Sequence, residues 1–257
     1  MMRIPGTLCT TRLGPDWIDP GTSARTRTPA PAHRHAPTQR VARHVAARPL
    51  SNDEQQVLAA LDRAGIANTN ERAMFLAQVS HESQDMRHVR ENLHYSAARL
   101  LTVFPTHFRT LEDAQAVATE GTDAIAERIY GNRADLGNTQ AGDGARYIGR
   151  GFIQLTGRTN YTAAGAALGL DLVNHPELAE DRVNAARIAV WFWNAHPRIG
   201  PAARAGNVRA VTRVVNGHEV GLADRERRYR RYRSVLPAQE PAAVAAPAAP
   251  AVPLRMP

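Results

Sequence analysis

Apolar residues recur every three to four positions along most of residues 51–236, which is the spacing of amphipathic helices. The first predicted helix begins with a capping-box pair, Ser51 and Glu54, and stops at Gly65. Asn70 is expected to cap the next helix. Further helices are predicted over residues 96–103, 111–119, 122–130, 160–168, 183–195, 207–215 and 221–235.

Alternation of apolar and polar residues, the pattern of a strand, is scarce in this chain. The one candidate strand covers residues 147–155, where glycines indicate a tight turn and a close backbone approach. The pattern therefore predicts a mainly α fold with at most a small β-hairpin or sheet. Together with the helices, it predicts one domain over residues 51–236.

The second helix carries the most informative residue. At 100° per residue, Phe75, Val79, Glu82 and Met86 lie on one helical face, so a carboxyl group stands within an apolar stripe. A carboxyl in such a place is costly to desolvate unless it is paired, hydrogen-bonded or kept protonated. We therefore expect Glu82 to be protonated near neutral pH and to act as a general acid.

Glu91 follows nine residues later, beyond the expected end of that helix. A protonated carboxyl and a second carboxylate are the two groups that hydrolyse a glycosidic bond, so Glu91 is a candidate general base. The structural alternative is that both glutamates are solvated or form ion pairs, with Arg87 and Arg90 as partners.

Other candidates have ordinary structural explanations beside the functional one. Gln154 and Thr156 share one face of the predicted strand, Asn160 begins the next helix, and Asn216 lies in a turn where it could simply cap a helix. Tyr95 belongs to a set of tyrosines that could line a cleft or pack in the core: Tyr95, Tyr130, Tyr147 and Tyr161. Trp191 and Trp193 are expected in the core, and the basic segment 225–233 on a solvated face that could also meet an acidic polymer.

The charge of the chain is concentrated in its first 50 residues. The net charge is +8, every basic residue other than histidine is arginine, and residues 1–50 hold eight arginines against Asp16 and Asp19. Residues 1–50 and the Pro/Ala-rich residues 237–257 are predicted to be disordered tails. Because residues 51–236 are nearly neutral, a nucleic-acid partner is not expected, whereas the Arg-rich end could attach to an anionic envelope surface.

Several classes of protein are disfavoured by what the chain lacks. Cys9 is the only cysteine, and the histidines do not have the spacing of a helical zinc site, so neither a metal nor another cofactor is expected. No run of 18 apolar residues predicts a transmembrane segment, and no apolar stretch near Met1 predicts a signal peptide. We expect synthesis in the cytoplasm, action on the cell wall after release or specialised export, and a monomer.

Four segments in order carry a resemblance to a known family: AQVSHESQDMRHVRENLHYSAARLLTVFP, IYGNR, GDGARYIGRGFIQLTGRTNY and NGHEVGLADRERRY. Together they resemble the family 19 glycoside hydrolases, especially the compact bacterial and phage-endolysin branch, over about residues 55–235. The resemblance implies a lysozyme-like, mostly helical fold with a substrate cleft. It also implies inverting, metal-free hydrolysis of β-1,4-linked polymers that contain N-acetylglucosamine.

The same resemblance implies roles for individual residues. Glu82 matches the general acid, and Glu91 matches the second carboxylate of the compact branch. The residues that match substrate- and water-positioning positions are Gln154, Thr156, Asn160 and Asn216. Thr156 stands where plant members often have serine, and the spacing of the carboxylates is shorter than in plant chitinases. For inversion, the two carboxyl groups are expected about 6.5–9.5 Å apart.

The substrate is left open between two polymers. Peptidoglycan carries peptide carboxylates, so the arginines favour it through electrostatic attraction, and the expected protein is an endolysin-like or muramidase-like hydrolase. A chitinase that acts on uncharged chitin is the alternative within the same chemistry. A lytic transglycosylase with a single essential glutamate, and a non-catalytic glycan-binding or structural relative, are the remaining alternatives.

Overall fold

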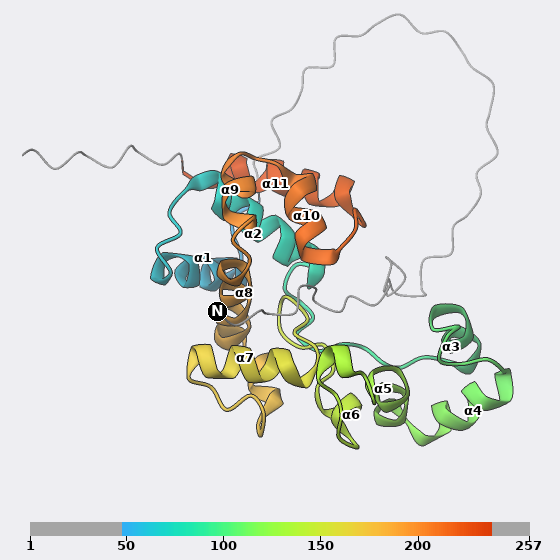
Figure 1. Ribbon diagram of the computed structural model, residues 1–257. Coiled ribbons are helices and arrows are strands. Elements are labelled where there is room, and N and C mark those ends of the chain that lie inside the picture. The colour runs from blue at the N-terminus through green and yellow to red at the C-terminus, as the bar shows by residue number, and fades with distance from the viewer. Residues whose placement is uncertain (1–47, 238–257) are drawn as a thin grey trace, which may run out of the picture.

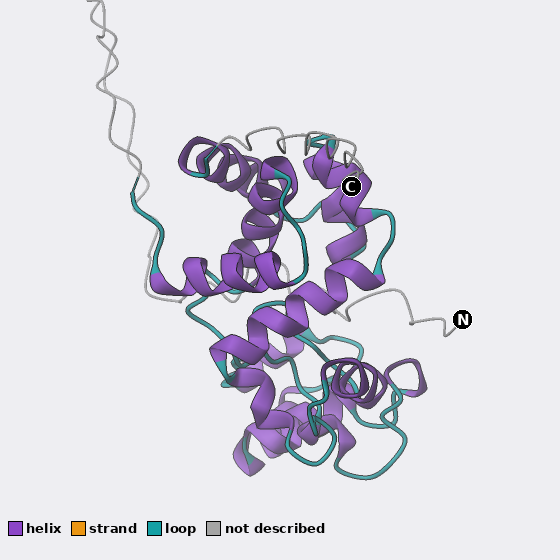
Figure 2. Ribbon diagram, turned by 90° about the vertical axis from the view of Figure 1, so that its left-hand side faces the viewer, coloured by secondary structure: helices purple, strands orange, loops and turns teal. Residues whose placement is uncertain are grey.

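The computed structural model describes residues 48–237, so the two predicted tails fall almost wholly outside the described residues. The regular structure of the described part is helical (Figure 2). Its elements are α1 (Asn52–Arg63), α2 (Thr69–Glu82), α3 (Ala97–Val103), α4 (Leu111–Glu120), α5 (Thr122–Tyr130), η2 (Ala134–Leu136), α6 (Asp143–Arg146), α7 (Arg158–Leu168), η3 (Pro176–Glu180), α8 (Arg182–Ala195), α9 (Ile199–Arg204), α10 (Val208–Asn216) and α11 (Leu222–Val235). The mainly α prediction is confirmed.

Local sequence signals explain where the helices begin. The capping box of α1 is confirmed, because the Ser51 side chain accepts from the Glu54 N–H and the Glu54 carboxylate accepts from the Ser51 N–H. The predicted cap of α2 was wrong by two residues: Asn68 accepts from the Glu71 N–H, whereas Asn70 donates to the Arg204 carbonyl. Two asparagines stood near the helix start, and spacing alone does not select between them. The short helices α6 and α9 were not predicted.

The predicted strand at residues 147–155 is absent, which corrects the sequence interpretation. Instead, Arg150 and Leu155 exchange two backbone hydrogen bonds of 2.8 and 3.1 Å and close a tight turn. Arg150 also forms an isolated antiparallel bridge with Arg90. In the described residues the β-structure consists of such isolated bridges, because residues 151–154 form a turn, with Gly151 at a φ of 72°, before a ladder can extend.

Two hydrophobic clusters organise the described part of the chain. The larger one joins α1, α2 and the helices from α7 to α11. The smaller one joins α3, α4 and α5 with the segment around Ile148. Figure 1 shows this division, with α3, α4 and α5 extending to one side of the remaining helices. The segment between α2 and α3 connects the two clusters and contains Glu91.

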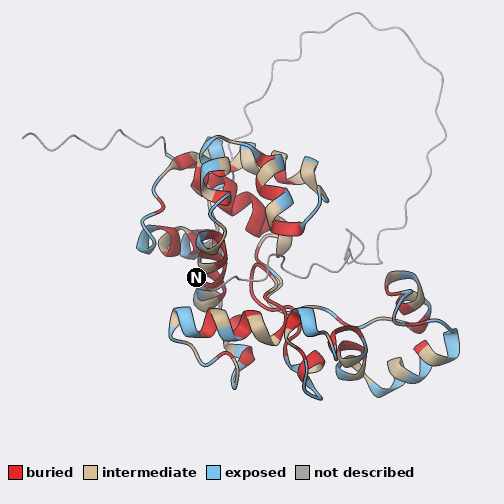
Figure 3. Ribbon diagram, viewed as in Figure 1, coloured by how far each residue is buried: buried red, intermediate tan, exposed pale blue. Residues whose placement is uncertain are grey.

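Helix α2 lies at the centre of the larger cluster. Ten of its fourteen residues are buried, and it packs along α11 (Figures 1 and 3). Its C-terminal end, which carries Glu82, therefore lies beside the first turns of the basic helix. No helix of residues 48–237 is both long enough and apolar enough to cross a membrane.

Candidate active site

Glu82 is the last residue of α2 and faces a buried arginine. The guanidinium of Arg225 donates to Glu82 Oε1 at 2.5 Å, to Gln78 Oε1 and to the Val220 carbonyl at 3.2 Å. Only 1% of Arg225 is exposed, so these contacts satisfy a charge that water does not reach. Gln78 is fixed in turn, because its amide donates to Thr212 Oγ1 at 3.2 Å.

This arrangement corrects the expected surroundings of Glu82. The sequence placed its carboxyl in an apolar stripe, and Phe75 and Val79 are indeed fully buried. The carboxyl itself, however, ends in an ion pair, and the partner is neither Arg87 nor Arg90 but Arg225, 143 positions later. Helical spacing gives the direction of a side chain from its own helix and says nothing about which residue arrives from another.

A second network holds the neighbouring residue, His81. His81 Nδ1 lies 2.7 Å from Asp224 Oδ2, and Arg228 Nε donates to the same oxygen at 2.6 Å. Burial, together with the charge of Arg225, lowers the pKa of His81, so the neutral ring is favoured. Gly221 is required here, because a Cβ at this position would lie 2.2 Å from His81 Cε1. The first turns of α11 therefore hold both residues at the end of α2.

The turn that follows Glu82 contains three successive non-glycine residues in the left-handed region, Gln84, Asp85 and Met86, with φ of 49°, 60° and 62°. Each such residue costs on the order of 1 kcal/mol and persists only where other contacts fix it. Ser83 Oγ donates to the Val79 carbonyl at 2.6 Å and accepts from the Met86 N–H at 2.9 Å.

Two arginines fix the same turn from outside. Arg228 pairs with the Asp85 carboxylate, and Arg182 donates to the Met86 carbonyl at 2.8 Å. Met86 itself is fully buried. The short path from Glu82 to Glu91 is thus anchored at several points, which limits the positions that the two carboxyl groups can take relative to each other.

Glu91 belongs to a different environment. Its Oε1 accepts from the Tyr130 hydroxyl at 2.7 Å and its Oε2 from the Gly149 N–H at 3.2 Å, while its own N–H donates to the Gly149 carbonyl at 2.9 Å. Burial raises the pKa of Glu91, and the hydrogen bonds from Tyr130 and Gly149 with the charge of Arg150 offset part of that rise. Glu91 is therefore the desolvated carboxyl that the sequence analysis expected at Glu82.

The side chains of Gln154 and Thr156, two of the predicted positioning residues, lie close to Gly149 and to Glu91. A Cβ built on Gly149 would lie 2.8 Å from Gln154 Oε1, 3.3 Å from Glu91 Oε2 and 3.4 Å from Thr156 Oγ1. Three side-chain oxygens thus surround one buried glycine, although the segment is a turn and not the strand from which their common face was inferred. Gln154 is held by its own amide, which donates to the Gly151 carbonyl at 3.0 Å.

The other predicted site residues have mainly structural contacts in the described chain. Asn160 donates to the Thr156 carbonyl at 2.8 Å and thereby fixes the backbone that carries Thr156. Asn216 ends α10, accepts from the His218 N–H at 2.9 Å and donates to the Val220 carbonyl at 3.2 Å. Arg225 uses that carbonyl too, so Asn216 acts on the Glu82 region through the turn.

The tyrosines divide into two groups. Tyr95 is half-buried and packs edge-on against Phe104, and burial together with the charge of Glu91 raises the pKa of its hydroxyl. Tyr130, Tyr147 and Tyr161 are buried. The Tyr130 hydroxyl donates to Glu91, whereas the Tyr147 and Tyr161 hydroxyls donate to backbone carbonyls. The sequence analysis placed Tyr130 among possible cleft residues but gave it no role.

Two residues of the site were missed by sequence reasoning, Arg225 and Gly149. The signal for Arg225 was the basic segment 225–233, which was interpreted as a solvated face. In the structure Arg225, Arg228 and Arg231 turn toward carboxylates of α2, its following turn and α1. The signal for Gly149 was the glycine-rich turn itself, which predicted a close approach without naming the partners.

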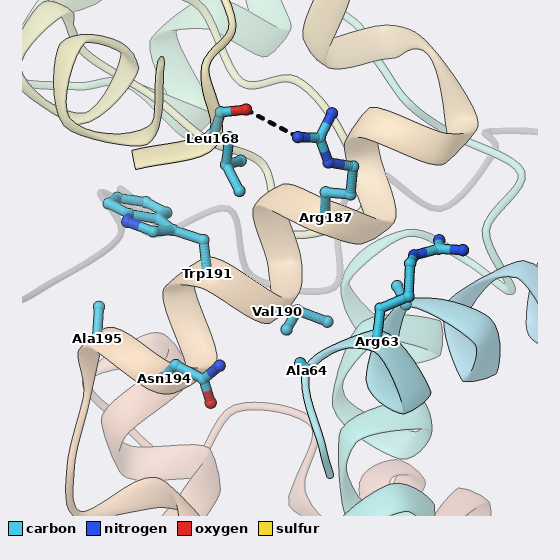
Figure 4. A pocket seen from close by; sticks show the side chains of 9 residues that line it. Arg63, Ala64, Leu168, Arg187, Val190, Trp191, Asn194 and Ala195 are labelled. Carbon is cyan, nitrogen blue, oxygen red and sulfur yellow. Dashed lines mark hydrogen bonds between the residues drawn. The ribbon is translucent and has the colours of Figure 1, made fainter. Parts of the chain in front are cut away.

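Two of the cavities among the described residues are informative. The arginine-lined cavity, of about 590 Å³, is lined by three acidic residues and four arginines: Asp123, Asp143, Glu177, Arg90, Arg146, Arg150 and Arg158. Arg90 and Arg150 are the chain neighbours of Glu91 and Gly149. The Trp191 cavity, of about 430 Å³, lies between α1, α8 and the end of α7 (Figure 4). Trp191 is only partly buried, which corrects its predicted core position, whereas Trp193 is in the core.

Known proteins resemble this chain in both sequence and structure. The family model described as Chitinase class I, of glycoside hydrolase family 19, matches residues 130–211. A "Glycosyl hydrolase family 19 domain-containing protein" of Haemophilus influenzae is 36% identical over 175 residues, which cover 68% of this chain and 84% of the relative. Chitinase 8 of Oryza sativa subsp. japonica is 60% identical over 48 residues, 18% of each chain.

Among solved structures, the crystal structure of a bacterial family 19 chitinase, described as differing from plant enzymes, is 25% identical. The match covers 74% of this chain and 88% of that one, with a TM-score of 0.47. The match to the H. influenzae relative covers 84% of that protein and, at 175 residues, is longer than the segment that the family model matches. On that match, the chain belongs to glycoside hydrolase family 19, and its relatives indicate glycoside hydrolase activity.

Proposed function

We propose that the protein hydrolyses β-1,4 bonds of peptidoglycan with inversion, using Glu82 as general acid and Glu91 as general base. The observation that carries the proposal is the different support of the two carboxyl groups. Glu82 is held by a cation and Glu91 by neutral donors in a desolvated turn. The two carboxyl groups are thus positioned independently of each other, and acid–base hydrolysis of a glycoside requires two separately placed carboxyl groups.

The surroundings of Glu91 suit a base. The Tyr130 hydroxyl and the Gly149 N–H both donate to it, so they orient the ionised carboxylate. Because burial raises its pKa, Glu91 is a stronger base than an exposed glutamate and removes a proton from water more readily. Gln154 and Thr156 bring polar groups to the same place, where they can orient the attacking water.

The contacts of Glu82 leave one oxygen for the proton transfer. Arg225 engages Oε1, so the proposal assigns the transferred proton to Oε2. In the reaction that proton moves to the glycosidic oxygen as the bond to the leaving sugar breaks, and water adds to the opposite face of the ring. For this outcome the two carboxyl groups are expected about 6.5–9.5 Å apart, which stays a prediction for a substrate complex.

The choice of peptidoglycan depends on charge. The arginine-lined cavity adjoins the chain neighbours of Glu91 and Gly149. Within it, Arg146 donates to two neutral acceptors, the carbonyls of Val173 and Asn174, and also interacts electrostatically with Asp171. Peptide carboxylates of peptidoglycan would be attracted there, whereas chitin offers no such group. A chitinase on chitin or chitooligosaccharides is the alternative, favoured by the description of the matching family model.

Parallel digestion of peptidoglycan and chitohexaose tests the proposal. The proteins are the wild type, Glu82→Gln, Glu91→Gln and the control Glu120→Gln, an exposed glutamate of α4. Products are identified by mass and by reducing-end chemistry. We expect reducing muropeptides from the wild type and Glu120→Gln, and a rate at least about 10³-fold lower for Glu82→Gln.

Each other outcome supports a named alternative. Release of oligosaccharides from chitin alone would change the assignment to chitinase. Anhydro-sugar ends, with activity kept in Glu91→Gln, would indicate a lytic transglycosylase. No product from either polymer, with the glycan still bound by the wild type, would leave a non-catalytic glycan-binding protein. The anomer first released, followed by NMR, separates inversion from retention.

A further inference from the structure

The Trp191 cavity shares no residue with the site around Glu82 and Glu91. Its lining comes from three helices and contains small apolar, aromatic and polar side chains: Ala60, Arg63, Ala64, Leu168, Arg187, Val190, Trp191, Asn194 and Ala195. Five of these residues belong to α8 at spacings of three or four, so they form one stripe along that helix. Figure 4 shows the stripe facing the end of α1.

The walls of this cavity are explained by residue size. Ala60 and Ala64 of α1 and Ala195 of α8 are small, and between them α1 and α8 leave open space above the core. Val190, also part of the lining, is almost fully buried. The volume of about 430 Å³ lies within the range of small-molecule sites, which combine an apolar lining with a few polar groups.

Trp191 gives the cavity an aromatic wall. The indole is only partly buried, and it lies at the side of the cavity near Leu168 (Figure 4). Trp193, two residues later, is in the core and donates its Nε1–H to Glu71 at 3.1 Å. Among the residues that the structure describes, Trp191 makes no such hydrogen bond. An aromatic face with a free polar edge is suited to a ligand that has one apolar and one polar side.

The charge of the cavity is positive. Its described lining contains two arginines and no acidic residue. Arg187 donates to the Leu168 carbonyl at 2.8 Å and to Asn184 Oδ1 at 3.2 Å, and neither partner carries a charge. Arg63 is exposed at the last turn of α1. A ligand with a carboxylate would therefore be attracted to this cavity, and its binding would not have to break an ion pair of either arginine.

We propose that the Trp191 cavity is a second glycan-binding site, which takes one N-acetylmuramic acid unit of the polymer. The apolar face of the sugar lies on the indole, and the Asn194 amide bonds the acetamido or hydroxyl groups. Arg63 and Arg187 attract the carboxylate that the unit carries, either on a free lactyl group or on the peptide attached to it. The choice of this sugar rests on the proposed function, whereas the aromatic, amide and cationic groups are independent of it. Binding here would hold the insoluble polymer near the catalytic site and raise its effective concentration.

The test measures binding separately from catalysis. In the Glu82→Gln background, binding of the full chain to purified insoluble peptidoglycan is measured by co-sedimentation. The added substitutions are Trp191→Ala, Trp191→Phe and Arg63→Glu, with Arg109→Glu as a charge-matched control at an exposed arginine outside the cavity. We expect the dissociation constant to rise about tenfold for Trp191→Ala and Arg63→Glu, and to change little for Trp191→Phe and Arg109→Glu.

Soluble ligands identify the occupant. The disaccharide of N-acetylglucosamine and N-acetylmuramic acid is compared with N,N′-diacetylchitobiose, and the indole ¹H–¹⁵N signal of Trp191 is followed by NMR. We expect a saturable shift of that signal with the first ligand only. On soluble short substrates, Trp191→Ala with Glu82 intact should keep the wild-type rate.

Three results would overturn the inference. The first is unchanged binding of insoluble peptidoglycan by both Trp191→Ala and Arg63→Glu. The second is an equal shift of the Trp191 signal with the two disaccharides, which would remove the role of the carboxylate. The third is a shift of the Trp191 signal when residues 238–257 are deleted, with no shift when saccharide is added. That result would mean that the chain itself covers the cavity. Digestion by the Glu82→Gln protein would instead contradict the proposed function and leave this binding test readable.

Discussion

Glu82 and Glu91 are both glutamates and lie nine residues apart in the sequence, yet different kinds of partner hold their carboxyl groups. Glu82 ends a regular helix of the larger hydrophobic cluster and faces the guanidinium of Arg225. Glu91 lies outside any helix, and a hydroxyl and a backbone N–H hold it. An ion pair fixes the carboxyl group of Glu82. The carboxyl group of Glu91 is desolvated, and neutral hydrogen-bond donors fix it.

This difference shows how one chain can hold two glutamates of the same short segment without making them equivalent. An ion pair with a buried cation fixes position strongly, but it depends on an element far along the sequence. Neutral donors in a turn fix position through the local backbone and leave the pKa of Glu91 raised. We therefore expect the two sites to respond differently when their supports are removed.

The largest effect is expected from Arg225→Gln. The change removes the cation from Glu82 and disturbs the contacts with Gln78 and the Val220 carbonyl. We expect kcat/KM to fall by about 10²- to 10³-fold, because Glu82 loses its fixed position. The free energy of unfolding should fall by about 3 kcal/mol, since a buried pair is broken. Steady-state kinetics and urea unfolding measure the two quantities.

The neighbouring Arg227→Gln is the matched control for that experiment. Arg227 is largely exposed and pairs only at the surface with Asp224, so both quantities should stay near those of the wild type. Arg225→Lys should retain little activity, because one ammonium does not reproduce the fork that contacts Glu82 and Gln78 together. Wild-type kcat/KM in Arg225→Gln would show that Glu82 needs no cation.

An intermediate effect is expected from Gly149→Ala. The added methyl group would lie 2.8 Å from Gln154 Oε1 and 3.3 Å from Glu91 Oε2. The nearest atom is the end of a flexible side chain, so the fold can adapt at small cost, but the adaptation displaces Gln154. We expect kcat to fall about 10- to 100-fold, while the melting temperature changes by a few degrees at most. A loss of stability as large as the loss of activity would indicate a purely structural glycine.

The smallest effect, and the most specific, is expected from Tyr130→Phe. The Tyr130 hydroxyl lowers the pKa of Glu91, so its removal raises that pKa further. A base works only when ionised, and the acid limb of the kcat/KM profile should therefore move to higher pH. At neutral pH we expect a loss of about fivefold, the usual scale of one hydrogen bond.

The free energy of unfolding should also depend on pH through the raised pKa of Glu91. Because the pKa of Glu91 is higher in the folded state than in the unfolded state, the folded state binds the extra proton. The contribution of Glu91 to stability is then full at acidic pH and declines as pH rises through the folded pKa. An acid limb that moves to lower pH in Tyr130→Phe would contradict the assignment of Glu91 as the base.

The helices were largely predictable because their signals are local. Periodicity and caps gave the positions of α1, α3, α4, α5, α7, α8, α10 and α11 to within one or two residues. For the candidate site, the sequence motifs identified individual residues, namely Glu82, Glu91, Gln154 and Thr156. The meeting of Glu91, Gln154 and Thr156 around Gly149, and the position of Glu82 at the end of α2, are observations of the structure.

Long-range partners were not predictable. Arg225 follows Glu82 by 143 positions, and nothing in the helical period of segment 225–233 says which arginine turns inward. The strand at residues 147–155 was predicted from alternation over a short glycine-containing run, where a closed turn between Arg150 and Leu155 satisfies the same backbone groups. Trp191 was assigned to the core because the helix is apolar overall, whereas burial is decided residue by residue.

The long separation between Glu82 and Arg225 also orders events during synthesis. A ribosome completes α2 early and reaches α11 only after most of the other helices. Chains fold from the N-terminus as they emerge, so a nascent chain has Glu82 long before it has the arginine that fixes it. An unfinished or truncated chain would therefore lack an organised acid. If Glu82 is the acid, the glycoside hydrolase activity would begin only when the chain has been made at least as far as α11.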